Sequence, residues 1–180
     1  MIDLHSEARR IIRLLNLVAH PLEGGFFRET YRCPDSLSGR GLPPGTGSAA
    51  GGDIDTTERS LATAIYYLLA PGHFSALHRL RHDEIYHFYL GDPVEMLLLY
   101  ADGNGETIRL GPDLAGGQRV QMVVSSGVWQ GARLLAGGRF ALLGTTMSPG
   151  FAADDFELAD RRALVASFPD YAELISRLTW

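Results

Sequence analysis

"GHFSALHRLRHDEIYHFYLG" (residues 72–91) holds four of the six histidines of this 180-residue chain. Apolar and polar residues alternate on both sides of a short polar turn, a pattern that predicts two β-strands. Because successive side chains of a strand point to opposite faces, His78 and Leu80 share one face. Glu84 and Tyr86 share a face of the second strand, and we expect Glu84 to return inward beside His78 on the neighbouring strand. The stretch therefore predicts an acid–base pair on the wall of a pocket.

The rest of the chain has the pattern of an all-β protein with helices at both ends. Apolar runs of strand length follow one another from 60 to 147, separated by Gly, Pro, Asn and Asp turn signals. Helical periodicity appears at 4–15 and at 161–180. This order predicts a single domain over 1–180 with an N-terminal helix and C-terminal helices. We expect side-chain caps on these helices from four residues: Asp3 or Ser6, Asp160 and Asp170.

Residues 34–58 differ in composition from the rest of the chain. Gly, Pro, Ser, Thr and Asp dominate this segment, and it has no hydrophobic periodicity. Such a segment buries too little apolar surface to offset the entropy of ordering it, so we expect a flexible loop. Trypsin is expected to cut it first, at Arg40 or Arg59. A lid over a pocket is the alternative role.

Composition excludes some classes of partner. The net charge of −5 provides no basic face for nucleic acid. Cys33 is the only cysteine, so no intrachain disulfide can form, which fits a reducing compartment. The N-terminal stretch lacks the apolar core of a secretory signal, and the run at 96–101 is too short to span a bilayer. We expect a cytoplasmic protein with no membrane partner.

The spacing within the opening stretch resembles the first conserved motif of the cupin superfamily. That motif consists of a glycine, five residues, His-x-His, three or four residues, a glutamate, six residues and a glycine. Gly72, His78, Glu84 and Gly91 match it, whereas Leu80 stands where the second histidine would be. The resemblance implies a small jelly-roll barrel, also described as a double-stranded β-helix.

The second cupin motif, Pro-x-Gly-x-x-His, has its counterpart in "SSGVWQ" at 125–130. Gly127 matches, Ser125 replaces the proline, and Gln130 stands where the third metal-binding histidine would be. The chain further resembles the group called cupin type 5. That resemblance rests on four stretches, "HPLEGGFFRETY", "SALHRLRHDEIYHFYLGDP", "SSGVWQGARL" and "SPGFAADDFELAD".

Cupin metal sites normally use three histidines and one glutamate, and this chain departs from that set. Leu80 cannot bind a metal, and Gln130 offers only a neutral amide oxygen, a poor ligand for zinc or iron. If a metal binds, its ligands are expected to be His78, Glu84 and Gln130. We predict no cofactor, apart from adventitious divalent metal. A metal-dependent cupin enzyme is therefore the less favoured alternative.

The favoured hypothesis is a pocket that binds a small polar or sugar-like molecule without a tightly bound metal. His78 and Glu84 are expected to contact the ligand, with Trp129 and Gln130 on the facing wall. A carboxylate beside an imidazole is expected to raise the pKa of the imidazole and to fix its tautomer. Two more residues are candidates for the ligand site, one for an anionic group and one at the mouth of the barrel: Arg28 and Phe151.

Whether the chain is an enzyme is left open. The alternative to simple binding is a metal-independent epimerase or isomerase acting on a sugar or sugar nucleotide. Cupins of that kind use a histidine base and a tyrosine acid, which implies His78 and Tyr86 here. We also expect a homodimer, because "FFRETYRC" at 26–33 alternates as an edge strand would, and exposed edges tend to pair.

Overall fold

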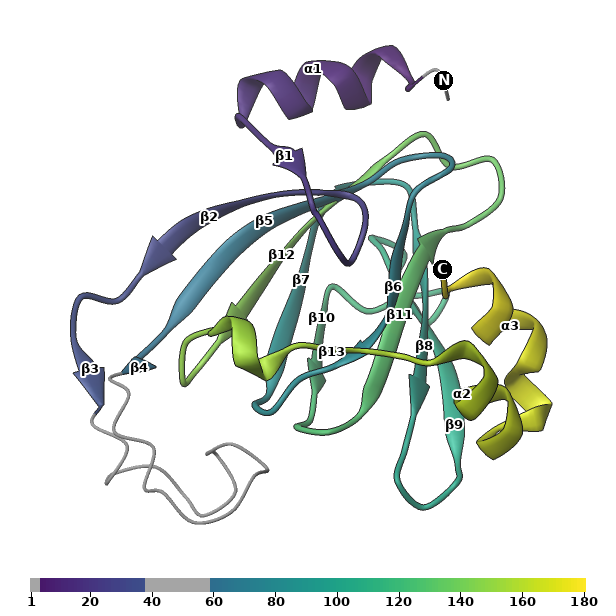
Figure 1. Ribbon diagram of the computed structural model, residues 1–180. Coiled ribbons are helices and arrows are strands. Elements are labelled where there is room, and N and C mark those ends of the chain that lie inside the picture. The colour runs from purple at the N-terminus through teal and green to yellow at the C-terminus, as the bar shows by residue number, and fades with distance from the viewer. Residues whose placement is uncertain (1–3, 38–58) are drawn as a thin grey trace.

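The computed structural model describes residues 4–37 and 59–180, and two facing antiparallel β-sheets dominate it (Figure 1). The fold is the expected β-rich jelly roll. The first sheet has the order β1 (Val18–Ala19), β2 (Phe26–Arg32), β5 (Thr63–Leu69), β12 (Ala141–Met147), β7 (Glu84–Gly91) and β10 (Gln121–Val124). The second has the order β13 (Glu157–Leu158), β6 (Phe74–Arg79), β11 (Trp129–Leu134), β8 (Val94–Leu99) and β9 (Gly105–Leu110).

The main core lies between the two sheets. Each strand sends alternate side chains inward, so apolar residues of both sheets meet in one cluster. Leu69, Tyr86 and Leu143 of the first sheet are buried in the same cluster as Met96 and Leu98 of the second. Phe27 and Ile65, which pack against this cluster, also line the cavity described below, so the core continues into the cavity wall.

Helices cover the outer faces of both sheets. Helix α1 (Ser6–Leu14) buries Ala8 against the first sheet, in a cluster with Leu68 and Leu142. Helices α2 (Arg161–Ser167) and α3 (Ala172–Arg177) lie beside the second sheet (Figure 1). They bury Leu164 and Ile175 against Leu77, Leu97 and Leu99. Among the described residues, no helix is long and apolar enough to cross a membrane.

One predicted helix cap is confirmed and two are corrected. Asp160 caps α2, and its side chain accepts a hydrogen bond from Ala163 N at 2.8 Å. The cap of α1 is His5 rather than Ser6, which is the first helical residue, while Asp3 lies outside the described residues. Asp170 does not cap α3, because it lies within a short 3-10 helix at Pro169–Tyr171 that precedes it.

The segment predicted as a loop, 34–58, contains a short strand near its start, and a second short strand follows directly after its end. β3 (Ser36–Leu37) pairs with β4 (Arg59–Ser60), so the boundaries of the segment form a two-stranded ribbon. Residues 38–58 and the expected trypsin site Arg40 lie outside the described residues. The other expected site, Arg59, is a poor one, because its side chain is buried and paired with Asp155 at 2.5 Å.

The turn between β6 and β7 crosses from one sheet to the other. β6 pairs with β11 and β13, whereas β7 pairs with β10 and β12. The sequence suggested that His78 and Glu84 lie on neighbouring strands of one sheet, but they belong to different sheets. They meet across the corner of the barrel, which brings both side chains to the same cavity.

Candidate functional site

A cavity of about 200 Å³ adjoins the core between the two sheets. The inner faces of β2, β5, β7, β12 and β6 provide most of its wall, and the turn before β2 and the segment after β12 close the rest. Apolar side chains make up much of the lining: Phe27, Ile65, Leu80, Met147, Phe151 and Phe156. The polar lining consists of His20, Glu23, Glu29, Arg32, Thr63, His78, Glu84 and Thr145. Mostly apolar walls with a few converging polar groups are typical of small-molecule sites.

His78 is held in one tautomer by the backbone. Its Nδ1 lies 2.7 Å from the carbonyl oxygen of Ala76, and a carbonyl only accepts hydrogen bonds, so Nδ1 must carry the proton. In the neutral ring, Nε2 then carries the lone pair, and the amide nitrogen of Gln130 approaches it to 3.4 Å. The ring is 2% exposed and stacks on Phe156, with 4.8 Å between ring centroids. His78 therefore offers the cavity a hydrogen-bond acceptor of fixed orientation.

Gln130 joins His78 to Glu84. Its Nε2 donates a hydrogen bond to Glu84 Oε2 at 2.7 Å and lies 3.4 Å from His78 Nε2. Gln130 is the register partner of His78 on β11, so the two side chains lie side by side on the second sheet. The expectation that Gln130 lies on the wall facing His78 is therefore wrong. In the structure Gln130 instead contacts both His78 and Glu84 through its amide nitrogen.

Two further polar residues of the cavity, His20 and Glu23, were missed in the sequence. They belong to the turn "HPLEGG" before β2, which has no periodicity to mark its side chains as inward. Gly24 and Gly25 at its end have φ of 94° and 66°, a region that favours glycine. A Cβ at Gly25 would lie 2.8 Å from the hydroxyl of Tyr67, so the turn packs tightly against β5. The sequence did offer one signal for this site: a histidine and a glutamate lie three residues apart in a turn that ends in two glycines.

His20 is fixed in the tautomer opposite to that of His78. Its Nδ1 accepts the backbone N–H of Glu23 at 2.8 Å and lies 3.4 Å from the N–H of Leu22. Nδ1 is therefore unprotonated, and the neutral ring carries its proton on Nε2. The same turn places Glu23 inward, where its carboxyl oxygen accepts a hydrogen bond from Ser75 Oγ at 2.5 Å.

Burial sets the protonation of these groups. Desolvation lowers the pKa of His78, and this effect exceeds the opposite effects of Glu84 and of the Ala76 carbonyl. The expectation that Glu84 raises the pKa of His78 above its usual value is therefore wrong, because burial lowers this pKa. Burial likewise lowers the pKa of His20 and raises the pKa values of Glu23 and Glu84. In all four groups burial therefore acts against the charged form.

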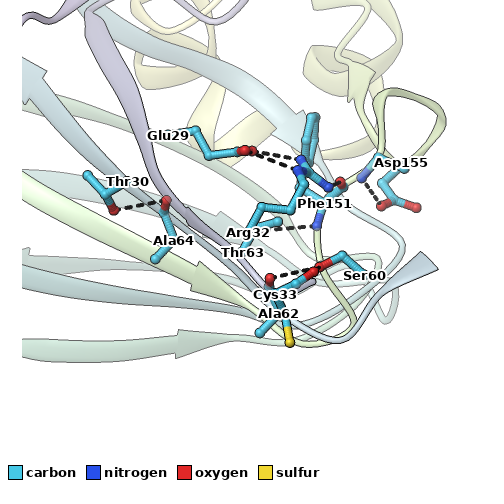
Figure 2. A network of polar contacts seen from close by, with 12 residues as sticks. Glu29, Thr30, Arg32, Cys33, Ser60, Ala62, Thr63, Ala64, Phe151 and Asp155 are labelled. Atoms are coloured by element: carbon cyan, nitrogen blue, oxygen red, sulfur yellow. Dashed lines mark hydrogen bonds and ion pairs between the residues drawn. The ribbon is translucent and has the colours of Figure 1, made fainter. Parts of the chain in front are cut away.

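The mouth of the cavity is held by a polar network around Arg32 (Figure 2). Arg32 binds both carboxylate oxygens of Glu29, at 3.0 and 2.7 Å, and donates to the carbonyl of Phe151 at 3.1 Å. The backbone N–H of Phe151 donates to Thr63 Oγ1 at 2.9 Å. Phe151 lines the cavity, and its backbone ties the segment after β12 to β2 and β5.

A bulge in β2 turns Arg32 toward the cavity. The register with β5 shifts between Glu29 and Tyr31, so Arg32 pairs with Thr63 and points to the same side as Glu29. Arg28, the predicted anion-binding residue, pairs with Tyr66 and does not line the cavity. Its guanidinium lies 5.8 Å from the centre of the Tyr66 ring.

Two other predicted site residues do not line the cavity. Trp129 precedes Gln130 in β11 and so points to the opposite face of the sheet. There it packs against the apolar cluster that the sheet forms with α2 and α3, and the guanidinium carbon of Arg79 lies 4.6 Å from the centre of its ring. Tyr86 does face inward, but it is 2% exposed in the core cluster below the cavity. Burial, with Glu84 nearby, raises the pKa of Tyr86 well above its usual value.

The cupin metal set fits these residues poorly. The amide nitrogen of Gln130 points at Glu84 and His78, so the group in the third ligand position is a donor rather than a metal ligand. Leu80 lines the cavity on the face of His78 and has no donor atom. Within residues 4–37 and 59–180, no group of three or more His, Cys, Asp and Glu side chains is arranged to hold a metal ion.

Two facing antiparallel sheets around a cavity of apolar walls and a few polar groups define the class of small jelly-roll barrels. Residues 9–159 match the family described as "Cupin superfamily (DUF985)", and the chain therefore belongs to this cupin family. The match includes both motif regions and the turn that carries His20 and Glu23. The resemblance in the sequence is confirmed.

The chain is also similar to individual proteins. It is 31% identical over 155 residues to "Uncharacterized protein YML079W" of Saccharomyces cerevisiae, covering 84% of this chain and 73% of that protein. Protein SO0799 from Shewanella oneidensis has a TM-score of 0.79 at 34% identity, covering 96% of this chain and 97% of that chain. A hypothetical protein from Leishmania major has a TM-score of 0.81 at 26% identity, covering 96% and 98%. Oxalate decarboxylase from Bacillus subtilis, at 16% identity and a TM-score of 0.50, shares only the fold.

Proposed function

We propose that this cupin binds a small, neutral, hydroxylated molecule in the barrel cavity, and that the protein's side chains rather than a tightly bound metal hold it. The observation that carries the proposal is the cavity itself. It combines apolar walls with a fixed acceptor on His78 and a fixed donor on His20. These are the groups that orient hydroxyl and carbonyl oxygens.

The size of the cavity limits the ligand. A cavity of about 150 Å³ is large enough for benzene, so one of about 200 Å³ suits a molecule of three to six carbons with its oxygens. The nucleotide part of a sugar nucleotide would have to lie outside it. A short polyol or a monosaccharide is therefore favoured over a sugar nucleotide.

The charges favour a neutral ligand. Glu23 and Glu84 both line the cavity, and each would repel an anion when ionised. Among the described lining residues, Arg32 is the one permanent cation, and Glu29 binds it through both oxygens. A phosphate or carboxylate ligand would have to displace Glu29, at the cost of an existing ion pair.

Binding can be tested with D-glyceraldehyde, D-erythrose, D-xylose and D-glucose in ligand-detected saturation-transfer NMR, alongside native mass spectrometry of the protein as purified. We expect at least one of these sugars to bind, and a bound metabolite rather than a metal to appear in the mass spectrum. Leu80→Phe, which adds volume inside the cavity, is expected to abolish binding. The matched control Leu90→Phe lies on the outside, 45% exposed, and should bind normally. Binding by none of the four sugars, or equal binding by both variants, would refute the proposal.

A further inference from the structure

The two histidines of the cavity present opposite functional groups to the same space. His78 Nε2 is an acceptor because Nδ1 is committed to the carbonyl of Ala76. His20 Nε2 carries a proton because Nδ1 accepts the N–H of Glu23. In each case a backbone group fixes the tautomer, so the arrangement does not depend on a mobile side chain.

Both rings lie against the same cavity wall. The ring centroid of Phe156 is 4.8 Å from that of His78 and 6.2 Å from that of His20. A charge on His78 also lowers the pKa of His20, as expected for neighbouring rings. A molecule of three to six carbons that contacts one ring can therefore reach the other.

We infer that His78 and His20 form an acid–base pair that enolises a neutral α-hydroxy carbonyl compound, with His78 Nε2 as the base and His20 Nε2–H as the donor to the carbonyl oxygen. The inference rests on the proposed function, since the reacting molecule must first bind in the cavity. His20, and not Tyr86, fills the acid's place, because Tyr86 does not line the cavity.

The chemistry needs no other reactant. The C–H bond next to the carbonyl breaks, its proton moves to His78 Nε2, and its electron pair becomes the C=C bond of an enediolate. The carbonyl π pair moves to the oxygen, where the His20 N–H stabilises the developing charge; a neutral imidazole can serve this purpose. Return of the proton to the same carbon restores or epimerises the compound. Return to the neighbouring carbon, with transfer of a hydroxyl proton between the two oxygens, gives the aldose–ketose isomer.

The remaining polar groups support this assignment. Burial keeps His78 neutral at neutral pH, as a base must be before reaction. When His78 takes the proton, the carboxylate form of Glu84 stabilises the new positive charge, since a charge on Glu84 raises the pKa of His78. Glu23 is held by Ser75 at the side of His20 and adds a second polar contact for the substrate's hydroxyl groups.

The test follows proton exchange in D₂O by ¹H NMR with the same four sugars. His78→Asn and His20→Asn are chosen because the asparagine amide can keep the backbone hydrogen bond of Nδ1 while Nε2 is removed. The native protein should exchange the α-proton of at least one sugar, and each variant should lose about 100-fold or more of the rate, the usual size of a general acid or base effect. His87→Asn, at an outward histidine that contacts Thr146, should leave the rate unchanged.

The outcomes separate this inference from the proposed function. Saturation-transfer signals without exchange in the native protein overturn the acid–base pair and leave binding intact. Absence of both overturns both. Exchange that survives in His20→Asn while it is lost in His78→Asn also overturns the pairing, because the donor would then lie elsewhere. Thermal melts of each variant show that any loss of rate comes from a folded protein.

Discussion

Replacing Gln130 by leucine tests the hydrogen bond that supports the acid–base pair. The amide donates to Glu84 Oε2 at 2.7 Å in a buried site, and its 3.4 Å contact with His78 is too long to add much. Leaving a buried acceptor without its donor costs about 1–3 kcal/mol. Part of this cost is offset, because Gln130 Oε1 is itself buried without a partner among the described residues, and leucine removes it. We expect a net loss of about 1–2 kcal/mol at pH 8.

The pH dependence gives the sign of the effect. Burial raises the pKa of Glu84 in the folded state above the unfolded value of 4.5, so this group favours folding at acid pH, and that stability is lost as pH rises through the folded pKa. The Gln130 hydrogen bond opposes this shift by stabilising the carboxylate. Without it the folded pKa rises further, and the penalty at neutral pH grows. The loss in Gln130→Leu should therefore be larger at pH 8 than at pH 5.

Thermal melts at the two pH values measure the difference. For a chain of this size, a loss of 1–2 kcal/mol corresponds to a fall of about 2–8 °C in Tm. Gln121→Leu, on the exposed face of β10, is the control and should change stability by no more than about 0.5 kcal/mol at either pH. An equal fall in Tm for Gln130→Leu at pH 5 and pH 8 would show that the residue acts through packing alone.

Four further outcomes are expected. Asp155→Ala leaves buried Arg59 without its partner and should cost about 3–5 kcal/mol in a urea melt, whereas Asp154→Ala, at an exposed neighbour, should cost little. Trypsin should cut at Arg40 before Arg59, and early cleavage at Arg59 in the folded protein would contradict its burial. Light scattering at micromolar concentration should give a homodimer; a monomer would refute pairing through the part of β2 beyond Phe27, which β1 leaves uncovered. Elemental analysis after chelation should find well under one metal per chain, with Tm unchanged, and a stoichiometric metal that resists chelation would oppose this.

Much of the fold could be predicted because the signals are local. Alternation within single strands and glycine-rich turns marked each strand from β5 to β12, and cap residues marked α2. The same alternation correctly placed His78, Leu80 and Glu84 on the cavity wall. Assigning the strands to sheets required long-range pairing, and for that reason the crossing between β6 and β7 was missed.

The errors at the site have local structural causes. Trp129 and Gln130 were assigned to one wall although neighbours in a strand face opposite sides. Arg28 lies between Phe27 and Glu29, which line the cavity, so alternation alone turns it away; the bulge after Glu29 brings Arg32 inward, and nothing in the sequence announces a bulge at that position. His20 reaches the site from a turn, where side-chain direction depends on φ values rather than on periodicity.

The β3–β4 ribbon offers a site at which a reporter domain can be inserted into the chain. Leu37 and Arg59 are register partners, so the two ends of the intervening segment lie next to each other, and Arg59 is anchored to Asp155 in the segment that also carries Phe151. A compact domain with adjacent termini, spliced in place of 38–58, would be joined at two fixed points without stretching the barrel. Since the anchoring segment forms part of the cavity wall, a fluorescent insert there would test whether the proposed ligand changes the optical signal when it binds.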